Sequence, residues 1–178
     1  AMICILLCLA CKTVPVTGRK QLNLVPNSMI QAMAFSQYDS VVKVSATLSQ
    51  YDERAQLVTS VGTKIQHAVE TYMQQNNMSK EIKNFKWEFN TINEETVNAW
   101  CMPGGKVVVY TGLLPVTQNE TALAVVMGHE IAHAIARHGN ERMSEGLLIN
   151  LGGLVLEEAL KENKELKLKL AQVRTKHL

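Results

Sequence analysis

The sequence lacks the features that mark several specialised classes of protein. Its net charge is only +2, charged residues make up 19% of the 178 residues, and no dense basic run carries interleaved aromatic residues. A nucleic-acid-binding surface usually has such a run, so no nucleic acid is predicted as a partner. Hydrophobic residues make up 47% of the chain, which is ordinary for a globular protein and sufficient for one domain with a core.

Cysteine is scarce outside the N-terminus, where three of the four cysteines lie, and Cys101 stands alone. This placement excludes a disulfide framework. The apolar run over residues 1–11 is too short to cross a bilayer, which takes about 20 residues. It is typical of the hydrophobic part of a secretion signal, and Ala10 before Cys11 resembles a bacterial lipoprotein signal, in which Cys11 would carry the lipid. The alternative is a short apolar N-terminus buried in the fold.

The segment after this run has little that indicates regular structure. Residues 12–26 contain two prolines, a glycine and three basic residues, which predicts an extended linker. Capping residues and apolar residues at three- and four-residue steps then predict helices over about 27–44 and 52–75.

The central part of the chain changes to the period of a strand. Residues 85–92, FKWEFNTI, alternate aromatic and polar side chains, which indicates a half-buried strand. Two further strands over 96–102 and 106–111 flank the sequence PGGK. A type II turn needs a positive φ at its second central position, so Gly104 suits a hairpin turn.

The last part of the chain is predicted to be helical. Thr117 or Asn119 can cap a helix over about 119–138, and because this helix is apolar nearly all round we expect it to be buried. Gly139 is expected to end it. The remaining residues, 141–178, begin with an uncharged stretch and end in a charged one typical of a solvated amphipathic helix. The predicted fold class is therefore α+β and mainly helical.

One motif in this helix carries chemistry. His129, Glu130 and His133 form the pattern HExxH. Side chains four residues apart share one helix face, so the two imidazoles can bind one zinc ion. Glu130, at the edge of that face, could take a proton from a zinc-bound water and pass it to a leaving amine.

His138 is the next histidine along the chain. It follows His129 by nine residues, which corresponds to about 900° of rotation in an ideal helix. This rotation predicts that His138 faces the opposite side, where it would act as a cation at the helix C-terminus. The motif itself therefore leaves the third zinc ligand unassigned.

Two paired motifs carry a resemblance to a known family. The sequence resembles the M48 zinc metallopeptidases in NAWCMPGGKVVVYTGLL and, further along, GHEIAHAIARHGNERM. It is most similar to the exported bacterial members, often lipoproteins, which are related to the mitochondrial inner-membrane protease of this family. The segment VPVTGRKQLNLVP also resembles the start of those lipoproteins.

The resemblance implies a fold and an activity. The fold would be a zincin-like domain over 27–178, with a small β-sheet or hairpin packed on the HExxH helix. The activity would be zinc-dependent hydrolysis of peptide bonds in misfolded envelope proteins, with one Zn²⁺ held by His129 and His133 and with Glu130 as general base. The protein would lie on the periplasmic side of the bacterial cell envelope, anchored in the membrane through the N-terminal lipid or signal.

The family's third ligand is a glutamate on a later helix, followed four residues on by an aspartate. No Asp follows Asp52 in this chain, so that pattern is absent. By residue type the candidates are Glu141, Glu145, Glu157, Glu158, Glu162 and Glu165. Of these, Glu157 and Glu158 lie at a distance from His133 that a turn and a returning helix could close. The absence of the family's pattern instead favours a domain that is incomplete at its C-terminus.

The resemblance also suggests how a polypeptide substrate would bind. The strand around Asn98, Ala99 and Trp100 would lie along the cleft and bind an extended backbone by strand addition; the alternative is ordinary core β-structure. Two other functions remain open. The first is a noncatalytic envelope lipoprotein that binds clients through the same groove. The second is a structural helical protein with an accidental motif.

Overall fold

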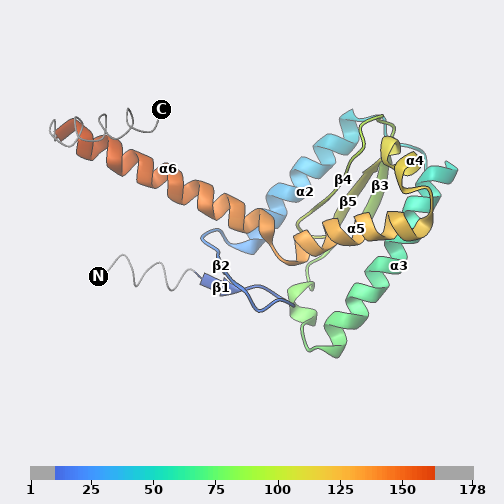
Figure 1. Ribbon diagram of the computed structural model, residues 1–178, viewed down its shortest axis with the longest axis horizontal. Coiled ribbons are helices and arrows are strands. Elements are labelled where there is room, and N and C mark those ends of the chain that lie inside the picture. Colours follow the sequence, from blue (N-terminus) through green and yellow to red (C-terminus); the bar gives the residue numbers. More distant parts are fainter. Residues whose placement is uncertain (1–10, 163–178) are drawn as a thin grey trace. The chain divides into compact units, whose positions relative to one another are not determined.

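The computed structural model describes the backbone of residues 11–162 and the side chains of residues 12–154 (Figure 1). The chain forms two compact units, residues 1–141 and 142–178. The main elements of the first unit are α2 (Asn27–Val44), α3 (Glu53–Gln75), β3 (Glu88–Ile92), β4 (Ala99–Met102), β5 (Lys106–Tyr110), α4 (Leu114–Thr117) and α5 (Glu120–Ile135). Helix α6 (His138–Glu162) begins in this unit and forms the described part of the second.

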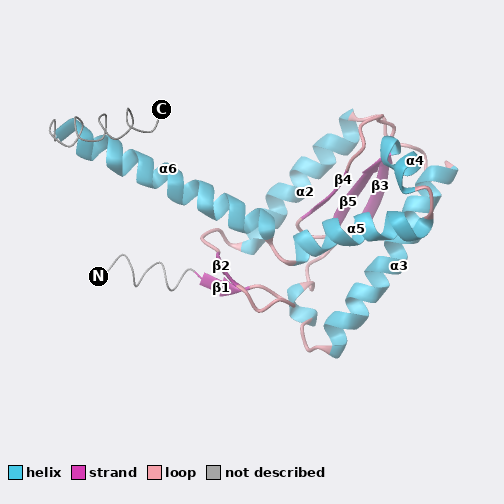
Figure 2. Ribbon diagram, in the orientation of Figure 1, coloured by secondary structure: helices cyan, strands magenta, loops and turns pink. Residues whose placement is uncertain are grey.

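The first unit has three layers, with a small sheet between two layers of helices. The sheet has the strand order β3-β5-β4, in which β5 is parallel to β3 and antiparallel to β4. Helix α2 covers one face of the sheet, while α3 and α5 cover the other (Figures 1 and 2). The mainly helical α+β fold predicted from the sequence, with a hairpin packed on the HExxH helix, is confirmed. Strand β4 is an edge of this sheet.

Two buried clusters lie on the two faces of the sheet. On the α2 face, Tyr38 packs against Ile92 and Val108, with the half-buried ring of Trp100 beside them. The cluster on the other face joins α3, the sheet and α5, and its members are Val58, Val61, Ala99, Val107, Val109, Leu113, Leu123, Met127 and Ile131. Because residues alternate along a strand, Ala99 and Cys101 face α5 and Trp100 faces α2.

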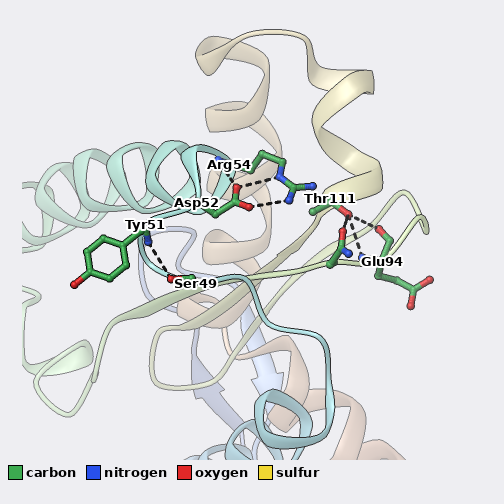
Figure 3. Close-up of polar contacts among 7 residues, drawn as sticks. Ser49, Tyr51, Asp52, Arg54, Glu94 and Thr111 are labelled. Carbon is green, nitrogen blue, oxygen red and sulfur yellow. Dashed lines mark hydrogen bonds and ion pairs between the residues drawn. The ribbon is translucent and has the colours of Figure 1, made fainter.

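Local sequence signals explain several element boundaries. Asp52 caps α3, since its side chain accepts a hydrogen bond from the Arg54 backbone N–H at 2.9 Å (Figure 3). Asn119 caps α5 in the same way through the N–H of Ala122. The turn between β4 and β5 places Gly104 at φ 95°, as the PGGK sequence predicts. Its neighbour Gly105 is also at positive φ, 87°.

A side-chain contact also ties the start of the segment after β5 to the loop that follows β3. The Thr111 hydroxyl donates to the Glu94 carbonyl at 3.0 Å and accepts from the Glu94 N–H at 3.1 Å (Figure 3). Thr111 therefore fixes the loop that leads into β4. This loop and the PGGK turn together hold β4 at both of its ends.

Helix α5 is buried on one face only, which corrects the expectation of a helix buried all round. The buried residues are Leu123, Met127, Ile131 and Ala134. On the opposite face Val125 is 68% exposed, and His129 and Ala132 are exposed as well. The sheet and α3 cover only one side of α5, so its other apolar face remains open to solvent.

The segment over 12–26 differs from the extended linker predicted for it. Strands β1 (Cys11–Thr13) and β2 (Lys20–Leu22) pair as an antiparallel hairpin. Val14 and Gln21 are buried, at 2% and 3% exposure. The proline and glycine that indicated a linker instead form the tight turn of this hairpin, closed by a hydrogen bond from the Val14 N–H to the Arg19 carbonyl.

The predicted signal segment, residues 1–11, lies outside the described residues except for the backbone of Cys11 in β1. The predicted charged end of the last helix also lies largely outside them. Within the described part of the chain, no helix is both long enough and apolar enough to cross a membrane.

Candidate metal centre

Helix α5 brings the two predicted zinc ligands together. The Nε2 atoms of His129 and His133 lie 2.9 Å apart, and the two rings meet edge to face with centroids separated by 4.4 Å. His129 lies on the exposed face of the helix and His133 is half-buried. The (i, i+4) spacing therefore places both ring nitrogens at one point of the helix surface.

This arrangement fits a zinc ion. Bonds of about 2.0–2.1 Å from zinc to each Nε2 span the 2.9 Å separation with an angle of about 90° at the metal. A small rotation of either imidazole widens this angle to the tetrahedral value that zinc prefers. The donor atoms are also the type that zinc selects, since neutral imidazole nitrogens are among its commonest ligands.

Glu130, the glutamate of the motif, is half-buried on α5. Burial raises the pKa of the Cys101 thiol to about 12, and the negative charge of Glu130 adds to this increase. The charge of Glu130 is therefore close to Cys101 in β4.

The structure describes no third ligand. Among the residues whose side chains are described, no three His, Cys, Asp or Glu side chains form a group that could hold a metal ion. The carboxylate of Glu141 is bound by both terminal nitrogens of Arg19, at 2.7 and 2.6 Å, and this ion pair lowers the pKa of Glu141. The side chains of Glu157 and Glu158 lie outside the described residues.

His138 lies beside the motif, which corrects the sequence-based expectation that it faces away. Its Nδ1 is 2.5 Å from Nδ1 of His133, and the ring centroids are 4.7 Å apart. The extrapolation failed because α5 ends at Ile135 and does not continue to His138. The chain turns at Arg137, with φ 59°, and Gly139, expected to end the helix, lies inside α6.

The N-terminal hairpin contributes residues to the surroundings of the histidine pair, which the sequence did not predict. A cavity of about 320 Å³ lies beside the histidine pair. The hairpin turn supplies part of its wall, and the lining residues are Pro15, Val16, Thr17, Arg19, His129, Ala132, His133, Ile135, Ala136 and His138. The likeness of the segment VPVTGRKQLNLVP to known lipoproteins was the one signal that could have pointed to these residues. The bidentate pair of Arg19 with Glu141 fixes this hairpin to the start of α6.

Among the described residues, no strand pairs with the outer edge of β4, the predicted substrate strand. Asn98 is exposed and immediately precedes β4, while Ala99 is buried towards α5. The Trp100 ring packs edge to face on Tyr38, with centroids 6.1 Å apart, and its Nε1 donates to the Tyr110 hydroxyl. The indole is therefore part of the α2-facing core. The Asn98 carbonyl accepts from the Tyr110 N–H in β5, and because hydrogen-bonded pairs alternate along an antiparallel ladder, the backbone groups that point to the outer edge of β4 are those of Ala99 and Cys101.

Comparisons with known proteins agree with this geometry. The model of peptidase family M48 matches residues 59–171. A mitochondrial metalloendopeptidase OMA1 of Schizosaccharomyces pombe is 33% identical over 132 residues, which cover 74% of this chain and 36% of that protein. The protein of the same name from Arabidopsis thaliana is 40% identical over 82 residues, 46% of this chain and 16% of that protein.

A bacterial relative is similar over a shorter region. The beta-barrel assembly-enhancing protease of Escherichia coli is 42% identical over 52 residues, 29% of this chain and 11% of that protein. The chain thus spans between 11% and 36% of the length of these three relatives.

Proposed function

Because the chain belongs to peptidase family M48, whose model matches residues 59–171, we propose that it is a zinc-dependent endopeptidase. The observation that carries the proposal is the convergence of the His129 and His133 Nε2 atoms, 2.9 Å apart on the exposed face of α5. The names of the relatives, metalloendopeptidase and protease, support the same reaction class. We propose misfolded envelope proteins as its substrates.

His129 and His133 would hold one zinc ion through Nε2. When bound, zinc polarises the scissile carbonyl and makes a nearby water more acidic. Glu130 takes a proton from the attacking water and donates it to the leaving amine, so the same carboxylate serves as base and then as acid. Its place next to His129 in the motif supports this role.

The free edge of β4 is the proposed binding site of the substrate backbone. An extended peptide could add to this edge as a further strand alongside Asn98, Ala99 and Trp100. Its main-chain hydrogen bonds would go to Ala99, because the Asn98 carbonyl already accepts from the Tyr110 N–H. Ala99 and Cys101 face α5, and Glu130 is close to Cys101. A peptide on this edge would therefore run past the carboxylate that the reaction needs.

The experiment follows cleavage of an unfolded polypeptide by the purified chain with zinc present. We expect cleavage that a chelator abolishes and that zinc restores. Glu130→Gln should lower the rate about 10²–10⁴-fold, the usual contribution of a general acid-base group. Glu120→Gln is the matched control on the same helix, because Glu120 is exposed and paired with Lys64. Full activity in Glu130→Gln would contradict the mechanism.

A second candidate function is client binding without cleavage. The cavity of about 320 Å³ beside the histidines has Pro15, Val16 and Ala132 in its lining, and such apolar walls could hold an apolar side chain of a client. In that case binding of an unfolded polypeptide would survive both the chelator and Glu130→Gln, and no cleavage would be measured. A zinc stoichiometry near one would count against this alternative.

We also propose that the chain is an envelope lipoprotein with its lipid on Cys11. The proposal rests on the lipoprotein-like sequence around Ala10 and Cys11. Metabolic labelling with a radioactive fatty acid in a bacterial host tests it. The label should be lost in Cys11→Ser and retained in Cys8→Ser, and equal labelling of both variants would refute the assignment.

A further inference from the structure

The turn between α5 and α6 holds His138 against the metal centre. Arg137 adopts the left-handed conformation, φ 59°, which residues other than glycine rarely adopt without support from their surroundings. The support comes from the fold. The Arg137 guanidinium pairs with the Glu81 carboxylate, and the buried Asn140 amide donates to the Val25 carbonyl at 2.8 Å and to Asn27 Oδ1 at 2.7 Å.

His133 uses its two ring nitrogens for two different neighbours. Its Nε2 faces Nε2 of His129 at 2.9 Å, and its Nδ1 faces Nδ1 of His138 at 2.5 Å. The two nitrogens lie on opposite sides of the ring. An ion between the two Nε2 atoms is therefore beyond the reach of His138 Nδ1.

We propose that His138 is a positioning residue that orients His133 for metal binding, an inference that rests on the proposed zinc site. A zinc ligand that binds through Nε2 carries its proton on Nδ1. The Nδ1–H of His133 then donates to Nδ1 of His138, which accepts as the neutral tautomer protonated on Nε2. This hydrogen bond fixes both the tautomer and the ring orientation of His133, as outer-shell partners of ligating histidines commonly do.

The surroundings of this pair favour a defined hydrogen bond. His133 and His138 are both half-buried, and they line the same cavity together with the apolar side chains of Ile135 and Ala136. Such apolar neighbours limit access of water, which would otherwise compete for Nδ1 of His133. The left-handed turn at Arg137 brings the His138 ring within hydrogen-bonding distance of His133. The backbone conformation of Arg137 therefore determines which neighbour His133 has at Nδ1.

The first experiment measures zinc affinity of the full chain by competition with a chromophoric chelator. His138→Leu should weaken zinc binding about 10–100-fold, the usual effect of removing an outer-shell partner. His138→Asn should retain most of the affinity, because its Oδ1 offers an acceptor close to the position of Nδ1. His67→Ala, on the exposed side of α3, is the matched control and should bind zinc normally. Equal affinity in all variants would overturn the proposal.

The second experiment records the ¹⁵N NMR signals of the His133 ring in zinc-free protein at a pH where the ring is neutral. We expect the Nδ1–H tautomer in the wild type and in His138→Asn, and a shift towards Nε2–H in His138→Leu. A wild-type His133 protonated on Nε2 would refute the inference, even if the leucine variant failed to fold. A wild type that has the expected tautomer but binds no zinc would instead refute the proposed function alone.

Discussion

Helix α5 carries apolar residues on two faces that have opposite surroundings. On the inner face Leu123 and Met127 are fully buried between α3 and the sheet. On the outer face Val125 is 68% exposed and lies one turn before the exposed His129. Apart from His129, the residues named on the outer face are small or aliphatic, as Leu123 is on the inner face, so apolar composition alone does not distinguish the two faces.

The two faces of α5 have different roles: the inner face contributes to the stability of the fold, and the outer face carries the proposed metal ligand His129. Burial of apolar surface stabilises a fold by about 25 cal/mol per Å² removed from water, and only the inner face contributes this term. The outer face is exposed at Val125 and His129, so in the proposed function an ion could reach His129 from solvent. Substitutions on the inner face should therefore affect folding, whereas those around the histidines should affect metal binding and cleavage.

The largest effect on stability is expected from Met127→Ala. Met127 is 0% exposed within the cluster that joins α3, β4 and α5, and removing a buried methionine typically costs about 2–5 kcal/mol. Urea unfolding followed by circular dichroism measures the change. The zinc affinity of the molecules that remain folded should be unchanged, since Met127 faces away from both imidazoles.

Val125→Ala is the matched control on the outer face. Because Val125 is exposed, the free energy of unfolding should change by no more than about 0.5 kcal/mol. A loss similar to that of Met127→Ala would mean that the outer face is covered in solution. The comparison of the two faces would then fail.

Much of this layered arrangement could be predicted from local sequence signals. The aspartate that caps α3 and the asparagine that caps α5 are side chains that satisfy free N–H groups at a helix start. The PGGK turn needs a positive φ that glycine supplies, so the antiparallel pairing of β4 and β5 followed directly. The HExxH spacing likewise implied that the two Nε2 atoms meet.

The surroundings of the histidines could not be predicted in the same way, because they depend on contacts between distant residues. The turn at Arg137 is supported by Glu81, which pairs with Arg137, and by Val25, whose carbonyl accepts from Asn140. Glu81 and Val25 both lie far from Arg137 in the sequence. An extrapolated helix therefore put His138 on the wrong side. The hairpin that lines the cavity was also missed, since its proline and glycine are equally compatible with a free linker.

The reactivity of Cys101, which lies on the inner side of β4 close to Glu130, is expected to be low. Burial raises the pKa of the thiol to about 12, with a further contribution from the Glu130 charge. Because the thiolate is the reactive form and a free cysteine has a pKa of about 8.5, alkylation at pH 8 should be roughly a thousandfold slower than in the urea-unfolded chain. Mass spectrometry of the peptide that contains Cys101 gives the rate.

The same measurement sharpens the position of Glu130. Removing its charge in Glu130→Gln should lower the Cys101 pKa slightly and speed alkylation severalfold, whereas Glu120→Gln, one end of an exposed pair with Lys64, should have no effect. Alkylation of Cys101 at the rate of an unfolded thiol would contradict the assignment of this residue to the inner side. An equal response to both glutamine variants would contradict the placement of Glu130 beside β4.

The smallest effect is expected where the hairpin meets the start of α6. Arg19 lowers the pKa of Glu141 in the folded state, so the pair adds stability above the ordinary glutamate pKa of about 4.3. This contribution is lost as the pH falls through the lowered folded-state value. Because the Arg19 side chain is 49% exposed, solvent screens the pair, and Glu141→Gln should cost only about 0.2–1 kcal/mol at neutral pH.

Urea unfolding of wild type and Glu141→Gln at pH 7 and at pH 3 measures this contribution. The two proteins should differ at pH 7, the difference should shrink at pH 3, and added salt should reduce the difference at pH 7. A difference that persists unchanged at low pH would assign the effect to packing instead of charge. Either result bears on the outer face of α5, because the Arg19–Glu141 pair fixes the hairpin that forms one wall of the cavity beside the histidines.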